Sequence, residues 1–358
     1  MSINRIYNTW MKRIRQMRPQ ERITRVRNFA WLLSGVLKSR CVHLRRIAEK
    51  IPGMATTNSK IRRLSRFLDN GAVRVREWYE PVARSLLEAA ANQGIEIQLL
   101  VDGSKIGFGH QLLIVALAYR KRAIPLAWTW VKGKRGHSSA YKQLALLKYV
   151  RQLIPDGAEV MIAGDSEFGA VKVLKQLDQW GWKYVMRQKC SHLIKLKGQL
   201  LWQQFGTLVE KSGQRFWSAS ALLTEQHAYS VNLLAYWKRG QKEPWLLATN
   251  LPTARDALRV YRRRMWIEEM FGDFKKHGFD LESTHLRHFL RLSRLTLVVA
   301  LLYLWLVAFG SQIIKRGHRR LVDRVDRKDL SIFRIGLSML ERYLANAQAL
   351  SIRLVPYF

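Results

Sequence analysis

The spacing of apolar residues between positions 95 and 187 constrains the fold more than any other feature of this 358-residue chain. Two runs, 138–154 and 170–180, repeat their apolar residues with a helical period. Five shorter runs are rich in apolar and β-branched residues and are predicted to be strands: 95–101, 111–119, 126–131, 158–163 and 182–187. The first three strands follow one another closely, with a bend expected over 120–125. We therefore expect them to form an antiparallel meander.

The resulting order of elements is βββαβαβ, which is the order of a ribonuclease H-like mixed sheet, so we expect an α/β fold. In open sheets of this kind, chemistry takes place at the carboxyl ends of the strands. Asp102 comes directly after the first predicted strand, and Asp165 comes after the fourth. Because these two strands are neighbours in this topology, we expect the two carboxylates to lie close together.

The rest of the chain differs from this central region in composition and period. Residues 1–66 contain 17 Lys and Arg but only 2 Asp and Glu. Further strand-like runs lie within 190–252, and helical periodicity returns at 254. We therefore expect five segments: a helical, basic DNA-binding domain (1–94), the first part of a catalytic core (95–189), a β-rich insertion (190–252), the second part of the core (253–314) and a basic helical C-terminal region (315–358).

A helix-turn-helix motif is predicted within the basic N-terminal segment. Residues 43–51 have a helical pattern, Pro52 and Gly53 interrupt it, and a second helix is expected from about Thr56 to Leu68. This outline is typical of helix-turn-helix DNA-binding motifs. The alternative is an ordinary helical bundle with a solvated basic face. If the motif is correct, four side chains of the second helix are candidate DNA contacts: Lys60, Arg62, Arg63 and Arg66.

The charge of the whole chain indicates which kind of partner the protein binds. Lys and Arg number 62 and Asp and Glu number 26, which gives a formal net charge of +36. A surface this basic attracts polyanions, of which nucleic acid is the usual one and an anionic membrane is the other candidate. The two cysteines, Cys41 and Cys190, cannot build a disulfide framework, so we expect a reducing cytosol.

One segment is apolar enough to cross a membrane. Residues 295–314 form a run of 20 residues without a charge. Both flanks are equally basic, so no charge asymmetry sets an orientation. We favour a helix buried within a large core, with a single-span membrane protein as the alternative.

The region from 254 onward contains four polar residues at helical spacing. On one continuous helix, Tyr261, Arg264, Glu268 and Lys275 would share a stripe about 60° wide. An Arg and a Glu four residues apart can also form a plain surface ion pair, and an Asp after a strand is most often a cap or a turn residue.

Taken together, the three acids have the composition of a site for hard divalent cations. Two carboxylates at strand ends and a third from a helix would repel one another, and Mg²⁺ or Mn²⁺ prefers such oxygen ligands. Two ions about 4 Å apart can activate the attacking oxygen and stabilise the leaving oxygen of a phosphodiester. The metal ligands expected are Asp102, Asp165 and Glu268.

Three motifs resemble those of the DDE transposases of bacterial insertion sequences. They are V-D-G-S-K at 101–105, A-G-D-S-E-F-G at 163–169 and Tyr261-x2-Arg264-x3-Glu268-x6-Lys275. The last is similar to the Y-R-E-K signature of the subgroup in which a β-rich insertion separates the second Asp from the Glu. The resemblance covers about 95–290.

The resemblance implies roles for individual residues. It implies a catalytic, metal-binding triad of Asp102, Asp165 and Glu268, and it assigns no role to Glu167. It also implies that Tyr261, Arg264 and Lys275 contact the DNA backbone near the cut.

The function implied is cut-and-paste transposition. The enzyme would bind terminal inverted repeats, cleave the element ends, in many members through a hairpin, and join the 3′-OH to target DNA. The resemblance also implies double-stranded DNA as partner, a homodimer in the synaptic complex and a place in the bacterial cytoplasm with the nucleoid. Because we favour a buried helix for 295–314, we expect no membrane as partner. The alternatives are a nuclease of the same fold without strand transfer and a non-catalytic DNA-binding regulator.

Overall fold

The computed structural model describes residues 2–94, 96–107, 109–133 and 138–358, which form two compact units. The sheet unit comprises Gly94–Ser104 and Gln111–Glu269. The helical unit comprises the chain up to Gln93, Lys105–His110 and Met270–Phe358. The sheet unit contains Asp102, Asp165 and Glu268. The division of the chain into five segments stays a prediction.

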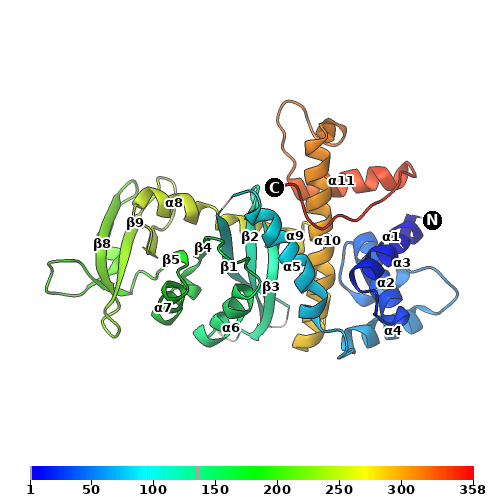
Figure 1. Cartoon of the computed structure of the whole chain (residues 1–358), viewed down its shortest axis with the longest axis horizontal. Coiled ribbons are helices and arrows are strands. Elements are labelled where there is room, and N and C mark those ends of the chain that lie inside the picture. The colour runs from blue at the N-terminus through cyan, green and yellow to red at the C-terminus, as the bar shows by residue number, and fades with distance from the viewer. Residues whose placement is uncertain (1, 95, 108, 134–137) are drawn as a thin grey trace. The chain divides into compact units, whose positions relative to one another are not determined.

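A ten-stranded sheet is the framework of the sheet unit (Figure 1). Strand β1 pairs in parallel with β4, and β4 pairs in parallel with β5, whereas β10, β9 and β8 continue the sheet antiparallel to their neighbours. In spatial order the strands are β3 (Arg122–Lys132), β2 (His110–Tyr119), β1 (Ile97–Ile106), β4 (Val160–Gly164), β5 (Lys183–Arg187), β10 (Trp245–Thr249), β9 (Tyr229–Tyr236), β8 (Arg215–Leu223), β6 (Leu193–Lys195) and β7 (Gln203–Gln204).

All five predicted strands of the central region are present, but two of them are longer than predicted. The sequence pattern ends strand β1 at Val101, whereas the strand runs to Ile106, so Asp102 lies within it. Strand β3 begins at Arg122 because the link from β2 is a tight turn in which Arg120 and Lys121 have φ of 41° and 63°. The bend predicted over 120–125 is therefore confined to two residues.

The segment predicted as a β-rich insertion extends the same sheet. Strand β10 lies against β5, with Leu247 opposite Arg187. Asp178 on the neighbouring helix α7 accepts hydrogen bonds from Tyr184 on β5, Tyr229 on β9 and Asn250 after β10. This one carboxylate thus ties three parts of the sheet to a helix.

The helices of the sheet unit lie on both faces of the sheet. In Figure 1, α6 and α7 lie on one side of β4 and β5, and α8 lies on the other. Two short 3₁₀ helices lie in the loops. The elements are α6 (Ala140–Arg151), η1 (Ser166–Phe168), α7 (Val171–Gln179), η2 (Phe205–Leu208), α8 (Ala254–Arg262) and the start of α9 (Met265–Phe274).

The prediction of one continuous helix from 254 onward is wrong, because a turn separates α8 from α9. Arg263 and Arg264 form a turn, in which the amide of Arg264 donates to the Tyr261 carbonyl at 2.9 Å. The amide of Ile267 in turn donates to the Arg264 carbonyl at 3.1 Å. These bonds span three residues instead of four, so the helix is interrupted and Arg264 lies at the break.

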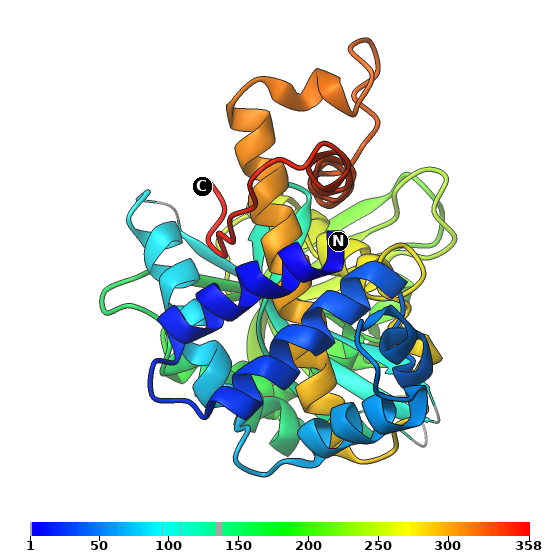
Figure 2. The ribbon, with the colours of Figure 1, turned by 90° about the vertical axis from the view of Figure 1, so that its right-hand side faces the viewer.

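The helical unit is built around one long apolar helix, α10 (Figure 2). Its apolar window has a mean hydropathy of 2.2 and is 89% buried, as expected for the predicted core helix. Arg294, near its start, donates to the carbonyls of Leu68 and Val73. The elements are α1 (Ser2–Met17), α2 (Ile23–Ser39), α3 (Leu44–Lys50), α4 (Thr57–Asp69), α5 (Val75–Ala91), η3 (Leu281–Ser283), α10 (Phe289–Lys315), η4 (His318–Leu321) and α11 (Ile332–Ala345).

The two helices predicted for the helix-turn-helix motif are present as α3 and α4, which pack against each other and against α2. Thr56 caps α4 by accepting a hydrogen bond from the Ser59 amide. The apolar face of α4 contributes Leu64, Phe67 and Leu68 to the core. Of the basic side chains on this helix, Arg62 and Arg66 are exposed, whereas Lys60 and Arg63 are half-buried.

Two glycines allow α10 and α11 to cross with their backbones in contact. A Cβ at Gly310 would lie 2.0 Å from the Ile332 carbonyl oxygen, and one at Gly336 would lie 1.9 Å from the Leu306 carbonyl oxygen. We predict that Gly310→Ala or Gly336→Ala lowers the free energy of unfolding by about 1–3 kcal/mol, because the backbone atoms of the two helices must move apart. Urea unfolding measures this.

Gly71→Ala is the matched control, because a Cβ at Gly71 would have nothing within 4 Å. Equal stability of all three variants would mean that the crossing tolerates a methyl group and would contradict the prediction.

Candidate active site

Two carboxylates come from adjacent parallel strands in matched register. Val101 on β1 pairs with Gly164 on β4, so Asp102 and Asp165 are the next residues along the chain at each position. Gly164 is needed for this close pairing, since a Cβ there would lie 2.8 Å from Cγ1 of Val101 and 2.7 Å from Sδ of Met186. The sequence prediction that β1 and β4 are neighbours is thereby confirmed.

Arg264 links the acid on β1 to the acid on α9. Its Nη1 lies 3.1 Å from Oδ2 of Asp102, and its Nη2 lies 2.6 Å from Oε1 of Glu268. The side chains of Arg264 and Asp102 are 9% and 13% exposed, whereas that of Glu268 is 46% exposed. The ion pair between Arg264 and Glu268, which could have been a plain surface pair, is therefore half of a bridge that reaches into the sheet.

Asp165 and Tyr261 each keep a buried oxygen without a hydrogen-bond partner in the described part of the chain, Oδ1 of the acid and Oη of the phenol. Tyr261 is only 2% exposed, and its ring lies edge-on to that of Trp245 at 5.1 Å. The Arg264 guanidinium lies over the same ring, 5.7 Å from its centre. Tyr261 thus helps to hold Arg264, and its proposed contact with DNA stays a prediction.

Burial and the neighbouring charges shift the ionisation of these groups. Burial raises the pKa of Asp102 from 3.8 to about 7, against the opposing effect of Arg264 and the Gly103 amide, and the other two acids add to the rise. Burial also raises the pKa of Tyr261 to about 12. Burial alone would lower the pKa of Arg264, but the neighbouring phenol and carboxylates outweigh it and hold that pKa above its ordinary value.

The other predicted DNA contacts lie in the helical unit. Lys275 pairs with Oε1 of Glu282 at 2.9 Å. On α4, the Nζ of Lys60 donates to the Ile51 carbonyl at 2.6 Å, and Arg63 is partly buried. Arg62 and Arg66, the two remaining side chains of that set, are exposed on the outer side of α4 about one helical turn apart, and their contact with DNA stays a prediction.

One residue near the acids has no role predicted from the sequence. Glu167 lies two residues after Asp165 and accepts hydrogen bonds from Nε2 of Gln111 at 2.8 Å and from the amide and hydroxyl of Ser138, both at 2.5 Å. These contacts fasten η1 to β2 and to the loop before α6. The only sequence signal is its position beside Asp165, which does not distinguish an anchoring acid from a catalytic one.

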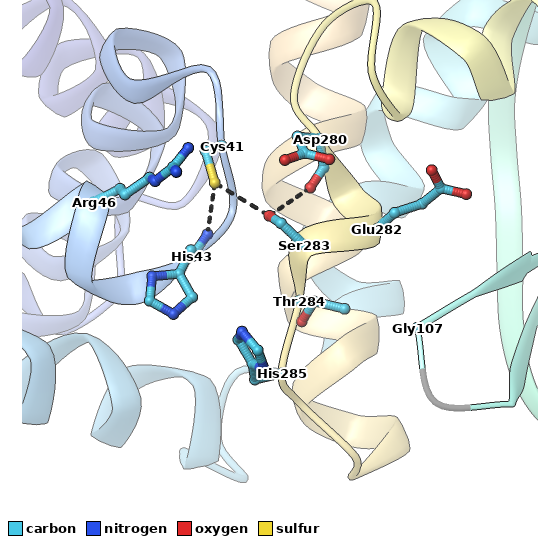
Figure 3. A pocket seen from close by; sticks show the side chains of 9 residues that line it. All are labelled: Cys41, His43, Arg46, Gly107, Asp280, Glu282, Ser283, Thr284 and His285. Atoms are coloured by element: carbon cyan, nitrogen blue, oxygen red, sulfur yellow. Dashed lines mark hydrogen bonds between the residues drawn. The ribbon is translucent and has the colours of Figure 1, made fainter.

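A separate cavity of about 460 Å³ lies within the helical unit (Figure 3). The Sγ of Cys41 lies 3.1 Å from the Ser283 hydroxyl, and the rings of His43 and His285 are 5.1 Å apart. The full lining is Cys41, His43, Arg46, Gly107, Asp280, Glu282, Ser283, Thr284 and His285. Neither the three acids nor Arg264 line this cavity.

The three acids offer the oxygen ligands that a divalent cation prefers, but their side chains are not arranged around a common point. Over the described residues, no three His, Cys, Asp or Glu side chains are grouped so as to hold a metal ion. The donor set is nevertheless all carboxylate oxygen, and the unpartnered Oδ1 of Asp165 is a free acceptor. Asp102 and Glu268, by contrast, each have one carboxylate oxygen in contact with the Arg264 guanidinium. In chemical type, the donor set therefore fits Mg²⁺ or Mn²⁺.

Two acids that directly follow the last paired residues of adjacent parallel strands, with a third acid from a helix, are typical of enzymes that transfer phosphoryl groups with divalent cations. The chain matches a family model described as a transposase DDE domain over residues 99–305. This match covers more than half of the chain and includes all three acids, so the protein belongs to the DDE transposase family.

Comparison with individual proteins adds little to this assignment. No curated protein matches the chain significantly. One solved structure similar to it is the cryo-EM structure of the piggyBac transposase synaptic complex with hairpin DNA. That likeness has 11% sequence identity and a TM-score of 0.43, and it covers 99% of this chain and 82% of that one.

The raised pKa of Asp102 predicts how stability depends on pH in metal-free buffer. Between pH 3.8 and about 7 the folded protein keeps a proton that the unfolded chain has lost, so the free energy of unfolding falls as the pH rises. Asp102→Asn should remove this contribution, which amounts to about 4 kcal/mol at most. Urea unfolding of both proteins in a chelator, from pH 4 to pH 8, measures the difference. Parallel pH profiles would mean that Asp102 ionises normally.

Proposed function

We propose that this protein is the transposase of a bacterial insertion sequence. It binds the terminal inverted repeats of the element, cleaves the element ends by phosphodiester hydrolysis and joins the freed 3′-OH to target DNA. The strand order β3-β2-β1-β4-β5, with β1, β4 and β5 parallel, supports a ribonuclease H-like core. The family assignment supports transposition as the overall reaction.

The observation that carries the proposal is the register of β1 and β4 together with the Arg264 bridge. The register brings Asp102 and Asp165 to equivalent positions on neighbouring strands, and the bridge connects Glu268 to the same place. This arrangement supports one shared site for three acids that are separated by 63 and 103 residues in the sequence (165 − 102 and 268 − 165).

Each acid has a role in this reaction. Asp102, Asp165 and Glu268 would hold two Mg²⁺ or Mn²⁺ ions. When bound, the ions supply charge that stabilises the attacking and leaving oxygens of the phosphodiester. Tyr261 keeps Arg264 beside the acids by packing under its guanidinium. Glu167 fixes η1, which directly follows Asp165, and so holds that acid in place.

DNA binding is proposed to use both units. The net charge of +36 attracts the duplex, and Arg62 and Arg66 on the outer side of α4 are suited to its phosphates. Tyr261, Arg264 and Lys275 are proposed to contact the backbone near the cut. We further propose a synaptic homodimer, a hairpin intermediate and a place in the bacterial cytoplasm with the nucleoid.

The triad predicts a separation of cleavage from binding. Asp102→Asn, Asp165→Asn or Glu268→Gln should abolish nicking, because each removes a negative metal ligand, while binding of the element end in Ca²⁺ survives. End-labelled duplexes taken from the DNA that flanks the coding sequence provide the substrate, and gel electrophoresis provides the measurement. Normal nicking by any of the three variants would exclude that acid from the site.

A second arm of the same assay separates a transposase from a nuclease of the same fold. A pre-cleaved end with a free 3′-OH is mixed with a supercoiled plasmid, and wild-type protein should join the two. Nicking without joining would favour the nuclease.

The proposed phosphate contacts predict a change in the salt dependence of DNA binding. Arg264→Ala, Lys275→Ala and the double variant Arg62→Ala/Arg66→Ala should each weaken end binding. Each should also flatten the plot of log K against log salt by about 1 for every phosphate that the substituted side chain neutralises. Arg84→Ala is the control, since Arg84 is an exposed arginine of α5 that is not among the proposed phosphate contacts. A wild-type slope in any variant would mean that the side chain in question meets no phosphate.

A further inference from the structure

Arg264 is held among the acids more firmly than a surface arginine would be. Its guanidinium uses one nitrogen on Asp102, at 3.1 Å, and another on Glu268, at 2.6 Å. The side chain is 9% exposed and lies over the Tyr261 ring. A planar guanidinium is suited to such a two-sided contact, in which a cation separates two carboxylates.

The same two carboxylates are proposed metal ligands. Oδ2 of Asp102 and Oε1 of Glu268 face the guanidinium, so neither oxygen can at the same time face a metal ion placed between them. A divalent cation there would also repel the positive charge of Arg264. Oδ1 of Asp165, by contrast, has no partner among the described residues.

We propose that Arg264 is a displaceable counter-cation, which occupies the space between Asp102 and Glu268 in the metal-free protein and must leave when a divalent cation binds there. This inference rests on the proposed function, because that function assigns the metal to the three acids. It adds that the metal and the arginine exclude each other at one place.

The local backbone is suited to this exchange. Arg264 lies in the turn between α8 and α9, outside the regular hydrogen bonding of either helix. Its Nε is buried without a hydrogen-bond partner in the part of the chain that the structure describes, so one donor stays unsatisfied while the bridge is in place. A DNA phosphate offers that donor an acceptor.

The exchange would couple metal binding to DNA binding. Once the guanidinium binds a phosphate of the element end instead, the oxygens of Asp102 and Glu268 are free to bind the cation. By linkage, the metal in turn makes Arg264 available and strengthens DNA binding to the same degree. The arginine would thereby keep the acids from holding a tightly bound metal until DNA is present.

A permanent structural bridge makes the opposite prediction. If Arg264 only held Asp102 and Glu268 in place, its removal would let the two acids separate and would weaken metal binding. The sign of the change in metal affinity therefore distinguishes the two roles without any measurement of catalysis.

The test is the affinity of the full-length, DNA-free protein for Mn²⁺, measured by electron paramagnetic resonance of the free ion. Arg264→Ala and the longer, neutral Arg264→Gln should each bind Mn²⁺ about tenfold more tightly than wild type. Arg262→Ala is the matched control. It removes the same charge two residues away, outside the bridge, and should bind Mn²⁺ as wild type does. Circular dichroism establishes which Arg264 variant is folded, and that variant decides the test.

Unchanged or weaker binding by the folded Arg264 variant would overturn the inference, as would equal tightening in the Arg262 control. Asp165→Asn, combined with the Arg264 substitution, should abolish the added affinity. If wild type binds Mn²⁺ through Asp165 but the Arg264 variants gain nothing, the counter-cation role fails and the proposed function stands. If no Mn²⁺ binding depends on Asp165 in any variant, both fail.

Discussion

Repulsion between carboxylates is the constraint on which the candidate site depends. Asp102 is largely buried, and a buried charge is costly unless an opposite charge accompanies it. Arg264 provides that charge and reaches Glu268 with the other side of its guanidinium. Its place follows from the break between α8 and α9, and its packing follows from Tyr261, which lies beneath it. A short turn in the backbone thus places one arginine between two acids that are distant in the sequence.

Much of the framework could be predicted because it is encoded locally. The buried strands β4 and β5 are short apolar runs, and α3 and α4 are separated by Pro52 and Gly53, so the sequence pattern places each within a few residues of its position. The end of β1 could not be predicted because Asp102, Gly103, Ser104 and Lys105 end the apolar run, whereas the strand continues to Ile106 beside β2. Pairing between strands is not visible in the composition of either.

The candidate site shows the same division between local and non-local information. Residue type and spacing single out Asp102, Asp165 and Glu268, and the strand order predicts which two are neighbours. The helix break at Arg264 escapes prediction because apolar residues continue at helical spacing on both sides of it. The burial of Tyr261 and the anchoring of Glu167 depend on partners more than 15 residues away, Trp245 and Ser138 among them. Sequence spacing carries no record of such partners.

The matched positions of Val101 and Gly164 have one more consequence. Successive side chains on a strand point to opposite faces, so a slip of β1 by a single residue would turn Asp102 to the wrong face of the sheet. Strands β1 and β4 each pair with a strand on both sides, so such a slip would disrupt the hydrogen bonds of two strand pairs. The acids are therefore carried where the sheet is least able to shear, and mutations at its outer strands should leave their alignment intact.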